Sequence, residues 1–404
     1  MEGALVSAVQ RARGMPLAGV RVLDLTQVMS GPYCTMMLAD MGAEVVKIER
    51  PIYGDDLRRT VPYRGRDGHQ DYFNALNRSK KSVVLDLKDA DQRGVARRLV
   101  ERADVLVENF SPGTVGRLGL GWDDVRELNP RLVYCSLSGF GQTGPYRDLL
   151  ALDSIIQAIS GLMSVTGEAD GEPLMVGAPL ADVIAGMFAA YAIVAALRLV
   201  DESGGGQYID LSMQAALLAA VGPRMGETLQ AGISPVRLGN ENPLRVPANT
   251  YRTLDGQWLA VMMHDELQWP RFCEALECPE WREDARFRTM PLRVAHRAEM
   301  NAAVSERFAK RAADDWIARL TAHRIPHALV KDYAQALRDP QVAHRGIVRE
   351  LRHAHSGTIR VVGPPWAMSV TETPMQAPPA LGQHTDEVLR GWLGAGAQQL
   401  GLSQ

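Results

Sequence analysis

The sequence predicts an α/β fold in which helices cover a parallel β-sheet. Short β-branched runs alternate with helical patterns between about residues 19 and 140. The pattern changes after Pro243, where a hairpin signal is followed by a helical stretch rich in Trp, Arg and Glu. These two observations predict a large, doubly wound domain of the Rossmann type and a smaller α+β domain.

The large domain begins with a regular alternation of strands and helices. Each predicted strand is flanked by turn residues. The predicted strands are 19–27, 42–51, 82–87, 104–110 and 131–140, and the helices between them are 31–42, 89–103 and 122–130. No G-x-G-x-x-G motif follows the first strand, so the sequence does not indicate a nicotinamide or flavin dinucleotide.

The rest of the chain sets the domain boundaries. Residues 150–230 have a helical pattern, which a flexible, glycine-rich segment at 201–213 is expected to break. A hairpin with its turn at Asp255-Gly256 is predicted over 248–263, and helices over 265–320. We therefore expect a large domain at 1–224, a small α+β domain at 225–325, and a return to the large domain at 326–404.

Composition limits the classes of function. At 404 residues the chain is long enough for two domains, and its net charge of −3 gives no sign of a nucleic-acid or membrane surface. The N-terminal residues lack the basic and then apolar pattern of a secretory signal, so we expect a cytoplasmic protein. The four cysteines are scattered and give no disulfide framework.

Several catalytic and metal-binding motifs are absent. His323 and His327 are four residues apart, but Pro326 interrupts the helix that would align them, and no H-E-x-x-H motif occurs. The sequence also lacks the G-x-S-x-G motif of serine hydrolases and the phosphate-binding P-loop. We expect no bound metal.

A single carboxylate stands out in the apolar stretch "GAPLADVIAGMFAAYAIVAAL", residues 177–197. Asp182 is the only charged residue in it. The stretch is long enough to be a transmembrane helix. It could also be a buried helix that begins near Pro179, with an acid in its first turn beside the positive end of the helix dipole. A third interpretation is a reactive carboxylate held in a water-poor site.

A group of cationic residues falls in loops or at strand starts, where a doubly wound sheet binds its ligands. Such a cluster would suit a polyphosphate such as coenzyme A (CoA). Each residue, taken alone, could equally be a solvated surface charge. The residues are Arg50, Arg78, Lys80, Lys81 and Arg117.

The motifs together resemble the class III CoA-transferases, the CaiB/BaiF or formyl-CoA transferase type. The resemblance extends in order from about residue 16 to 392. The segments that carry it are "PLAGVRVLDLTQVMSGPYCTMMLADMGAEVVKIERP", "LNRSKKSVVLDL", "DVLVENFSPG", "SGFGQTGP", "PLADVIAGMFAAYAIVAAL", "GGGQYIDLSM" and "LGQHTDEVL".

The resemblance implies a mechanism and an assembly. The nucleophilic aspartate of the family lies in the pattern P-L-x-D-x-x-x-G, which falls on Asp182. It forms an anhydride and then an aspartyl-CoA thioester, so the CoA ester is a substrate and no cofactor is bound permanently. Members form interlocked dimers, so we expect a homodimer or a heteromer with a related subunit, and no nucleic-acid or membrane partner.

The resemblance also implies residues that bind CoA and a loop that closes over the site. In the family this loop is rich in glycine. It falls near 237–250 here, where Gly239 is the only glycine left of that run. Met29 stands where relatives of the formyl branch have Gln, so a side-chain amide contact to the substrate is lost there. The implied CoA contacts are Val28, Met29, Arg50, Leu76, Asn77, Lys80, Lys81, Asn109, Phe110 and Arg117.

Two alternatives share this fold. The α-methylacyl-CoA racemases use the same aspartate with an upstream histidine, but Leu152 occupies the histidine position here, and leucine cannot move a proton. A transferase acting on a monocarboxylate, such as formate, oxalate or a carnitine-like acid, is the other alternative.

The segments at 54–59, 76–83 and 245–256 resemble the branch that uses dicarboxylic acids. We therefore expect transfer from succinyl-CoA to malate, citramalate or a glutarate derivative. Arg58, Arg59 or Arg245 would hold the distal carboxylate of the acceptor. Alternatively, Arg58 and Arg59 hold the 3′-phosphate of CoA or are merely exposed.

Overall fold

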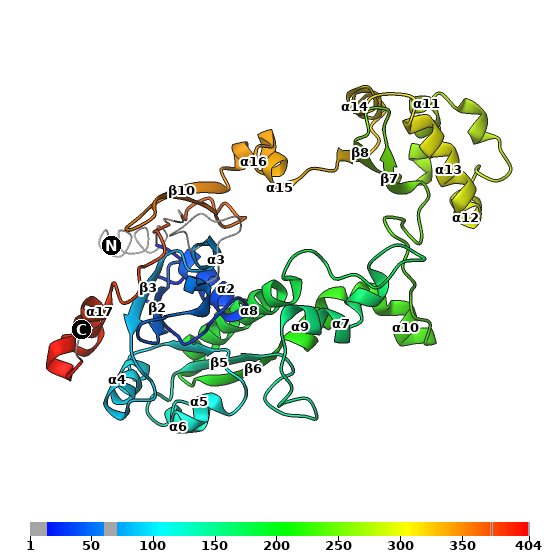
Figure 1. Ribbon diagram of the computed structural model, residues 1–404. Helices are drawn as coiled ribbons and strands as arrows, with labels where there is room; N and C mark the ends of the chain where they lie inside the picture. The colour runs from blue at the N-terminus through cyan, green and yellow to red at the C-terminus, as the bar shows by residue number, and fades with distance from the viewer. Residues whose placement is uncertain (1–13, 60–70, 372, 374, 403–404) are drawn as a thin grey trace, which may run out of the picture. The chain divides into compact units, whose positions relative to one another are not determined.

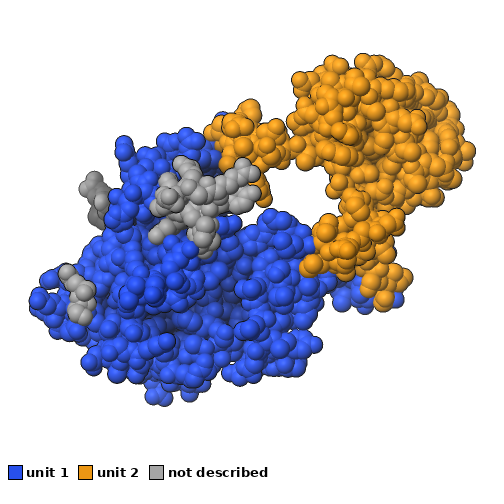
Figure 2. Space-filling model, in the orientation of Figure 1, with its two compact units in different colours: residues 1–162, 175–231, 344–404 blue, residues 163–174, 232–343 orange. Residues whose placement is uncertain are grey.

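The computed structural model describes residues 14–59, 71–371, 373 and 375–402 (Figure 1). The chain divides into two compact units (Figure 2). The large unit consists of residues 1–162, 175–231 and 344–404, and the small unit of residues 163–174 and 232–343. The large unit is therefore built from both ends of the chain.

These boundaries differ from the expected 225 and 325. Helix α10 (Gly226–Ala231) belongs to the large unit. Strand β9 (His327–Leu329) pairs with β8 (Trp258–Met262), which extends the small unit beyond residue 325. Residues 163–174 join the small unit, where the Gly239 N–H donates to the Gly167 carbonyl over 2.9 Å.

The large unit contains a six-stranded sheet in the order β3-β2-β1-β4-β5-β6, and every pairing in it is parallel. This is the strand order of a doubly wound Rossmann sheet, as predicted. The strands are β1 (Arg21–Asp24), β2 (Glu44–Glu49), β3 (Lys80–Val84), β4 (Val105–Glu108), β5 (Val133–Ser138) and β6 (Gln207–Ser212).

Strand β6 corrects the expectation of a flexible break at 201–213. Gly204 ends the preceding helix with a φ of 76°, a conformation that favours glycine. Gly206 then passes so close to β5 that an added Cβ would lie 2.2 Å from the Leu132 carbonyl oxygen. The next six residues pair with β5, so the glycines form a tight entry into an edge strand.

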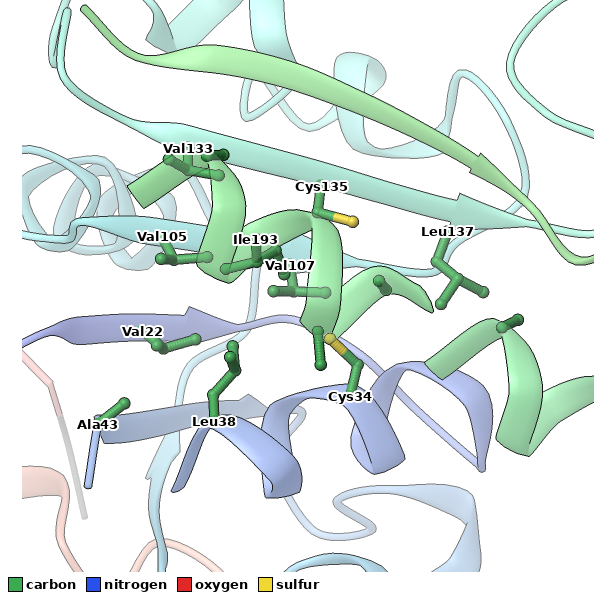
Figure 3. Close-up of a cluster of buried hydrophobic side chains, with 14 of the residues drawn as sticks. Val22, Cys34, Leu38, Ala43, Val105, Val107, Val133, Cys135, Leu137 and Ile193 are labelled. Carbon is green, nitrogen blue, oxygen red and sulfur yellow. The ribbon is translucent and has the colours of Figure 1, made fainter. Parts of the chain in front are cut away.

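Helices cover both faces of the sheet. One face carries α2 (Ser30–Asp40) and α8 (Leu180–Ser203), which pack on side chains from β1, β4 and β5 (Figure 3). The other carries α4 (Ala90–Val100) and the C-terminal α17 (Thr385–Leu393). The remaining helices are α3 (Asp71–Leu76), α5 (Thr114–Arg117), α6 (Trp122–Val125), α7 (Asp153–Ile159) and α9 (Met213–Val221), with a 3₁₀ turn η1 at Asp56–Arg59.

Helix α8 is long and apolar enough to cross a membrane by length and composition alone. In this structure one face of the helix lies in the core of the large unit. It packs along α2, and Ala185, Ala189 and Ile193 are buried in the cluster beside the sheet. The transmembrane interpretation of 177–197 is therefore not supported.

The small unit contains the predicted hairpin. Strands β7 (Ala248–Arg252) and β8 are antiparallel, and Gly256 in their turn has a φ of 78°. Tyr251, Phe308 and Trp316 stack in its core. Its helices are α11 (Trp269–Ala275), α12 (Met290–Ala295), α13 (Arg297–Phe308), α14 (Ala313–Ala322) and α15 (Tyr333–Leu337). Helix α16 (Pro340–Arg345) and the hairpin β10 (Val348–His353) and β11 (Gly357–Val362) lead back into the large unit.

Candidate active site

A pocket of about 320 Å³ lies at the carboxyl ends of β1, β4 and β5. Its walls are 27–30 and 109–112, which follow β1 and β4, and 137–139 at the end of β5, together with Arg147, 149–152, Asp182 and Met213. Strand order reverses between β1 and β4, and a crevice at such a switch point is where doubly wound sheets bind ligands. All of these residues belong to the large unit.

Asp182 enters the pocket from the first turn of α8, which begins directly after Pro179. The hydroxyl and the backbone N–H of Ser30, which begins α2, both donate to its carboxylate. Burial raises the pKa of Asp182, and the nearby negative charge of Asp153 raises it further, to about 6. The carboxylate is thus more basic than an exposed aspartate but still largely ionised at neutral pH.

Asp153 caps helix α8 from the neighbouring helix α7. Its Oδ1 accepts the backbone N–H groups of Ala181, over 2.7 Å, and of Asp182, over 3.3 Å. Its Oδ2 accepts a 2.6 Å hydrogen bond from the buried Gln157. This arrangement fixes the start of α8, and with it the position of the Asp182 side chain.

The loop after β1 is held from two sides. Asn109 exchanges two 2.8 Å hydrogen bonds with the backbone of Gln27. Val28 has a φ of 66°, and its N–H donates to Asp55, which forms a fully buried ion pair with Lys47 over 2.9 Å. The pocket wall formed by this loop is therefore anchored in the interior of the sheet.

The structure brings several predicted site residues together in this pocket. They are Asp182 and the expected CoA contacts Val28, Met29, Asn109 and Phe110. Arg117 lies close by, exposed at the end of α5, where it donates to the Thr114 hydroxyl over 2.9 Å.

Two other expected CoA contacts lie in the protein interior. The Lys80 ammonium is fully buried and donates to Asp24, over 3.1 Å, and to Asn77, over 2.9 Å. Burial lowers the pKa of Lys80 to about 8. Burial by itself would raise the pKa of Asp24, but the charges of Lys80 and Lys47 and the hydrogen bonds from two threonine hydroxyls together lower it to about 2. The structure gives Lys80 and Asn77 a role in supporting the fold, which argues against direct phosphate contacts.

The remaining expected CoA contacts lie outside the residues that line the pocket. Arg50 is exposed and pairs with Asp56. Leu76 is half-buried at the end of α3. Lys81 bridges Glu44, over 2.7 Å, and Glu387, over 2.8 Å.

The predicted acceptor-binding residues are also dispersed. Arg58 makes two 2.7 Å hydrogen bonds with Glu49 and stacks 3.6 Å from the centre of the Phe73 ring, so the fold occupies its guanidinium group. Arg59 is exposed over the ring of Tyr53. Gly239 and Arg245 belong to the small unit, where Arg245 donates to the His264 carbonyl over 3.2 Å.

Sequence reasoning missed the residues that complete the pocket. Ser30 lies one residue before the predicted helix 31–42 and had no assigned role, and Arg147 follows the segment "SGFGQTGP", which contributed only to the family resemblance. A hydrophobic wall from Leu149 to Leu152 was also missed. Within the described ranges, no group of three or more His, Cys, Asp or Glu side chains could hold a metal ion.

Doubly wound sheets bind ligands at such a switch point, and a half-buried aspartate with a raised pKa there is a candidate functional residue. The model of CoA-transferase family III matches residues 17–385, and the chain belongs to this family. The protein is therefore an enzyme, a family III CoA-transferase.

The chain is similar to characterised transferases over nearly its whole length. It is 38% identical to the succinate–glutarate CoA-transferase of Agrobacterium fabrum, over 93% of this chain and 96% of that protein. It is 35% identical to the human succinyl-CoA:glutarate CoA-transferase, over 93% and 85%. The crystal structure of a CaiB/BaiF family protein from Brucella suis superposes with a TM-score of 0.85 at 32% identity, over 94% and 99%.

Proposed function

We propose that this CoA-transferase moves CoA from succinyl-CoA to a dicarboxylic acid, such as glutarate or a derivative of it, malate or citramalate. Asp182 is the covalent nucleophile. The similarity to two transferases named for succinate or succinyl-CoA and glutarate supports the substrate class.

The observation that carries the mechanism is the environment of Asp182. Its carboxylate faces the pocket, accepts hydrogen bonds from Ser30 and has a pKa of about 6. A carboxylate that is ionised at neutral pH attacks a thioester without a general base. Its raised pKa makes it a stronger nucleophile than an exposed aspartate.

The reaction proceeds in four balanced steps. An oxygen of Asp182 attacks the thioester carbonyl, the C–S bond breaks, and a mixed anhydride and CoA thiolate form. The thiolate attacks Cγ of Asp182, which releases the donor acid and leaves an aspartyl-CoA thioester. The acceptor carboxylate attacks this thioester and again expels the thiolate. The thiolate then attacks the acyl carbonyl of the acceptor, which frees Asp182 and the new CoA ester.

The intermediates must be kept from water, and because Leu149, Leu150 and Leu152 of the pocket wall are 54%, 86% and 71% exposed, a bound substrate has to cover this wall. Anhydrides and thioesters hydrolyse, and exclusion of water suppresses this side reaction. Leu149, Leu150, Leu152 and Met213 supply apolar surface around Asp182. Val28, Met29, Asn109, Phe110 and Arg117 are the proposed contacts of CoA, which is a substrate and not a resident cofactor.

Arg59 and Arg245 remain the proposed partners of the acceptor's distal carboxylate, because Glu49 holds the guanidinium group of Arg58. Arg245→Ala is expected to lower kcat/KM for glutarate at least ten-fold while butyrate, which lacks the second carboxylate, is affected little. Arg252→Ala, a change at an exposed arginine of the same unit, is the matched control. Equal losses with both acceptors would remove Arg245 from the proposal.

One incubation tests the function directly. The purified protein is mixed with succinyl-CoA and a panel of carboxylic acids in deuterated buffer, and the CoA esters are analysed by mass spectrometry. A new ester of a dicarboxylic acid is the expected product. Esters that remain unchanged except for deuterium at the α-carbon would instead indicate racemase chemistry, despite Leu152 in the pocket. A new ester formed only from monocarboxylates would contradict the proposed acceptor class.

A further inference from the structure

Arg147 is the one cationic side chain among the described residues that line the pocket. It lies in the loop between β5 and α7, and its Nη1 atom is 3.2 Å from Asp148. Both partners of this ion pair are solvent-exposed, so the pair contributes little and leaves the guanidinium available to a ligand.

The guanidinium group of Arg117, at the end of α5, lies near that of Arg147. A Cβ built on Gly113 would lie 3.2 Å from Nη2 of Arg147 and 3.4 Å from Nη1 of Arg117. Gly113 has a φ of 79° and no side chain, so both guanidinium groups pack closely against its backbone and lie near each other.

Two cations that lie close together repel each other, and an anion bound to both offsets this repulsion. A phosphate monoester carries between one and two negative charges at neutral pH and three acceptor oxygens, and it suits two guanidinium groups. A carboxylate carries only one charge. The pair therefore fits a phosphate better than the distal carboxylate of an acceptor.

We infer that Arg147 and Arg117 together bind a phosphate group of CoA beside the Asp182 pocket, with Arg147 as a further determinant of CoA affinity. This inference rests on the CoA-transferase activity of the family and is independent of which acid accepts CoA.

The test compares a complete substrate with a truncated one. Succinyl-CoA carries the phosphates, whereas succinyl-pantetheine has the same thioester and pantetheine arm without them. Arg147→Gln is expected to raise KM for succinyl-CoA roughly 10- to 100-fold, as for the loss of a charged hydrogen bond, with a smaller effect on kcat. With succinyl-pantetheine, Arg147→Gln and the unmodified enzyme should have the same KM.

Two further variants sharpen this result. Arg147→Lys keeps the positive charge but loses the planar guanidinium group that donates two parallel hydrogen bonds. Its KM for succinyl-CoA should therefore lie between those of Arg147→Gln and the unmodified enzyme. Arg126→Gln removes an exposed arginine of the same unit that does not line the pocket, and it should leave both KM values unchanged. Calorimetric titration with free CoA should show the same order of affinity, and it requires no acceptor.

Two outcomes would overturn the inference. If Arg147→Gln impairs succinyl-pantetheine as strongly as succinyl-CoA, the residue does not act on phosphate. If the loss instead depends on the acceptor, appearing with glutarate but not with butyrate, then Arg147 binds the acceptor carboxylate. If the unmodified enzyme binds CoA but transfers it to none of the acids, the proposed acceptors are wrong. The order of CoA affinities among the Arg147 variants would still test the phosphate site.

Discussion

At the scale of single residues, the reactivity of Asp182 depends on two neighbours. Ser30 donates hydrogen bonds that stabilise the ionised carboxylate, whereas burial and Asp153 favour the protonated form and raise the pKa to about 6. The expected consequence is an acid limb near pH 6 in the pH profile of kcat/KM, because only the ionised carboxylate attacks the thioester.

Asp153→Asn tests this balance. The asparagine oxygen can still accept the N–H groups that cap α8, but the negative charge is gone, so the pKa of Asp182 should fall and the acid limb should shift to lower pH. The measurement is the pH dependence of kcat/KM with succinyl-CoA. Asp123→Asn, which removes an exposed acid of α6 that does not line the pocket, is the control. An unmoved acid limb in Asp153→Asn would show that Asp153 does not tune Asp182.

Sequence patterns singled out Asp182 and the pocket residues Val28, Met29, Asn109 and Phe110, but not Ser30 or Arg147. The motif and the apolar setting were visible in one stretch of chain. The capping contact of Asp153 spans 28 residues, and the burial of Lys80 depends on Asp24, 56 residues away. A lysine at the start of a strand resembles a surface charge in sequence, because its buried partners are distant in the chain.

At the scale of elements, the site depends on the close crossing of α2 and α8. Gly186 permits this crossing, since an added Cβ would lie 2.6 Å from the Ser30 carbonyl oxygen and 3.2 Å from the Cys34 nitrogen. Ser30 is also the hydrogen-bond donor to Asp182. The spacing of the two helices therefore determines how the nucleophile is held.

Gly186→Ala should separate the two helices. We expect a loss of about 1–3 kcal/mol in the free energy of unfolding, as for an overpacked core, together with a lower kcat because Ser30 shifts away from Asp182. Denaturant unfolding and steady-state kinetics measure the two effects. Gly94→Ala in α4, where the added Cβ meets nothing within 4 Å, should instead be neutral or slightly stabilising. Equal behaviour of the two variants would contradict the role of Gly186.

The strands of the large unit were predictable because β-branched runs are bounded by turn residues. Strand β6 was not predicted, because the glycines at 204–206 resemble a flexible linker and the edge position of the strand gives it only partial burial. Its pairing with β5 is a tertiary contact that local sequence does not encode.

At the scale of the whole molecule, helix α8 presents apolar side chains to solvent on the side that does not face the sheet. Met187, Phe188, Tyr191 and Val194 are between 39% and 74% exposed, and their spacing puts them on one face of the helix. Exposed apolar surface of this kind marks an interaction site. We propose that a second copy of the chain, or a related subunit, covers it in the interlocked dimer expected from the family resemblance.

Tyr191→Glu tests this assembly. A charge at the most exposed position of the face should weaken the dimer, which light scattering coupled to size-exclusion chromatography would detect as a shift toward the monomer. Leu128→Glu, a change at an exposed leucine next to α6, should leave the mass unchanged. A monomeric unmodified protein would contradict the proposed dimer.

The path of the chain through the two units explains which parts of the domain division could be predicted from sequence. The return of the C-terminus to the large unit follows from α17, whose Val388, Leu389 and Trp392 are buried beside the sheet. The second boundary lies at 343 and not at the expected 325, because β9, which is only three residues long, pairs with β8 far upstream.

The most direct test of the central claim is to trap the aspartyl-CoA thioester. The enzyme is incubated with succinyl-CoA and no acceptor, treated with hydroxylamine, digested and analysed by peptide mass spectrometry. We expect a hydroxamate on Asp182 that appears only with the CoA ester, and no such product in Asp182→Ala. Transfer activity that persists in Asp182→Ala, or a hydroxamate on another residue, would contradict the assignment of Asp182 as the nucleophile.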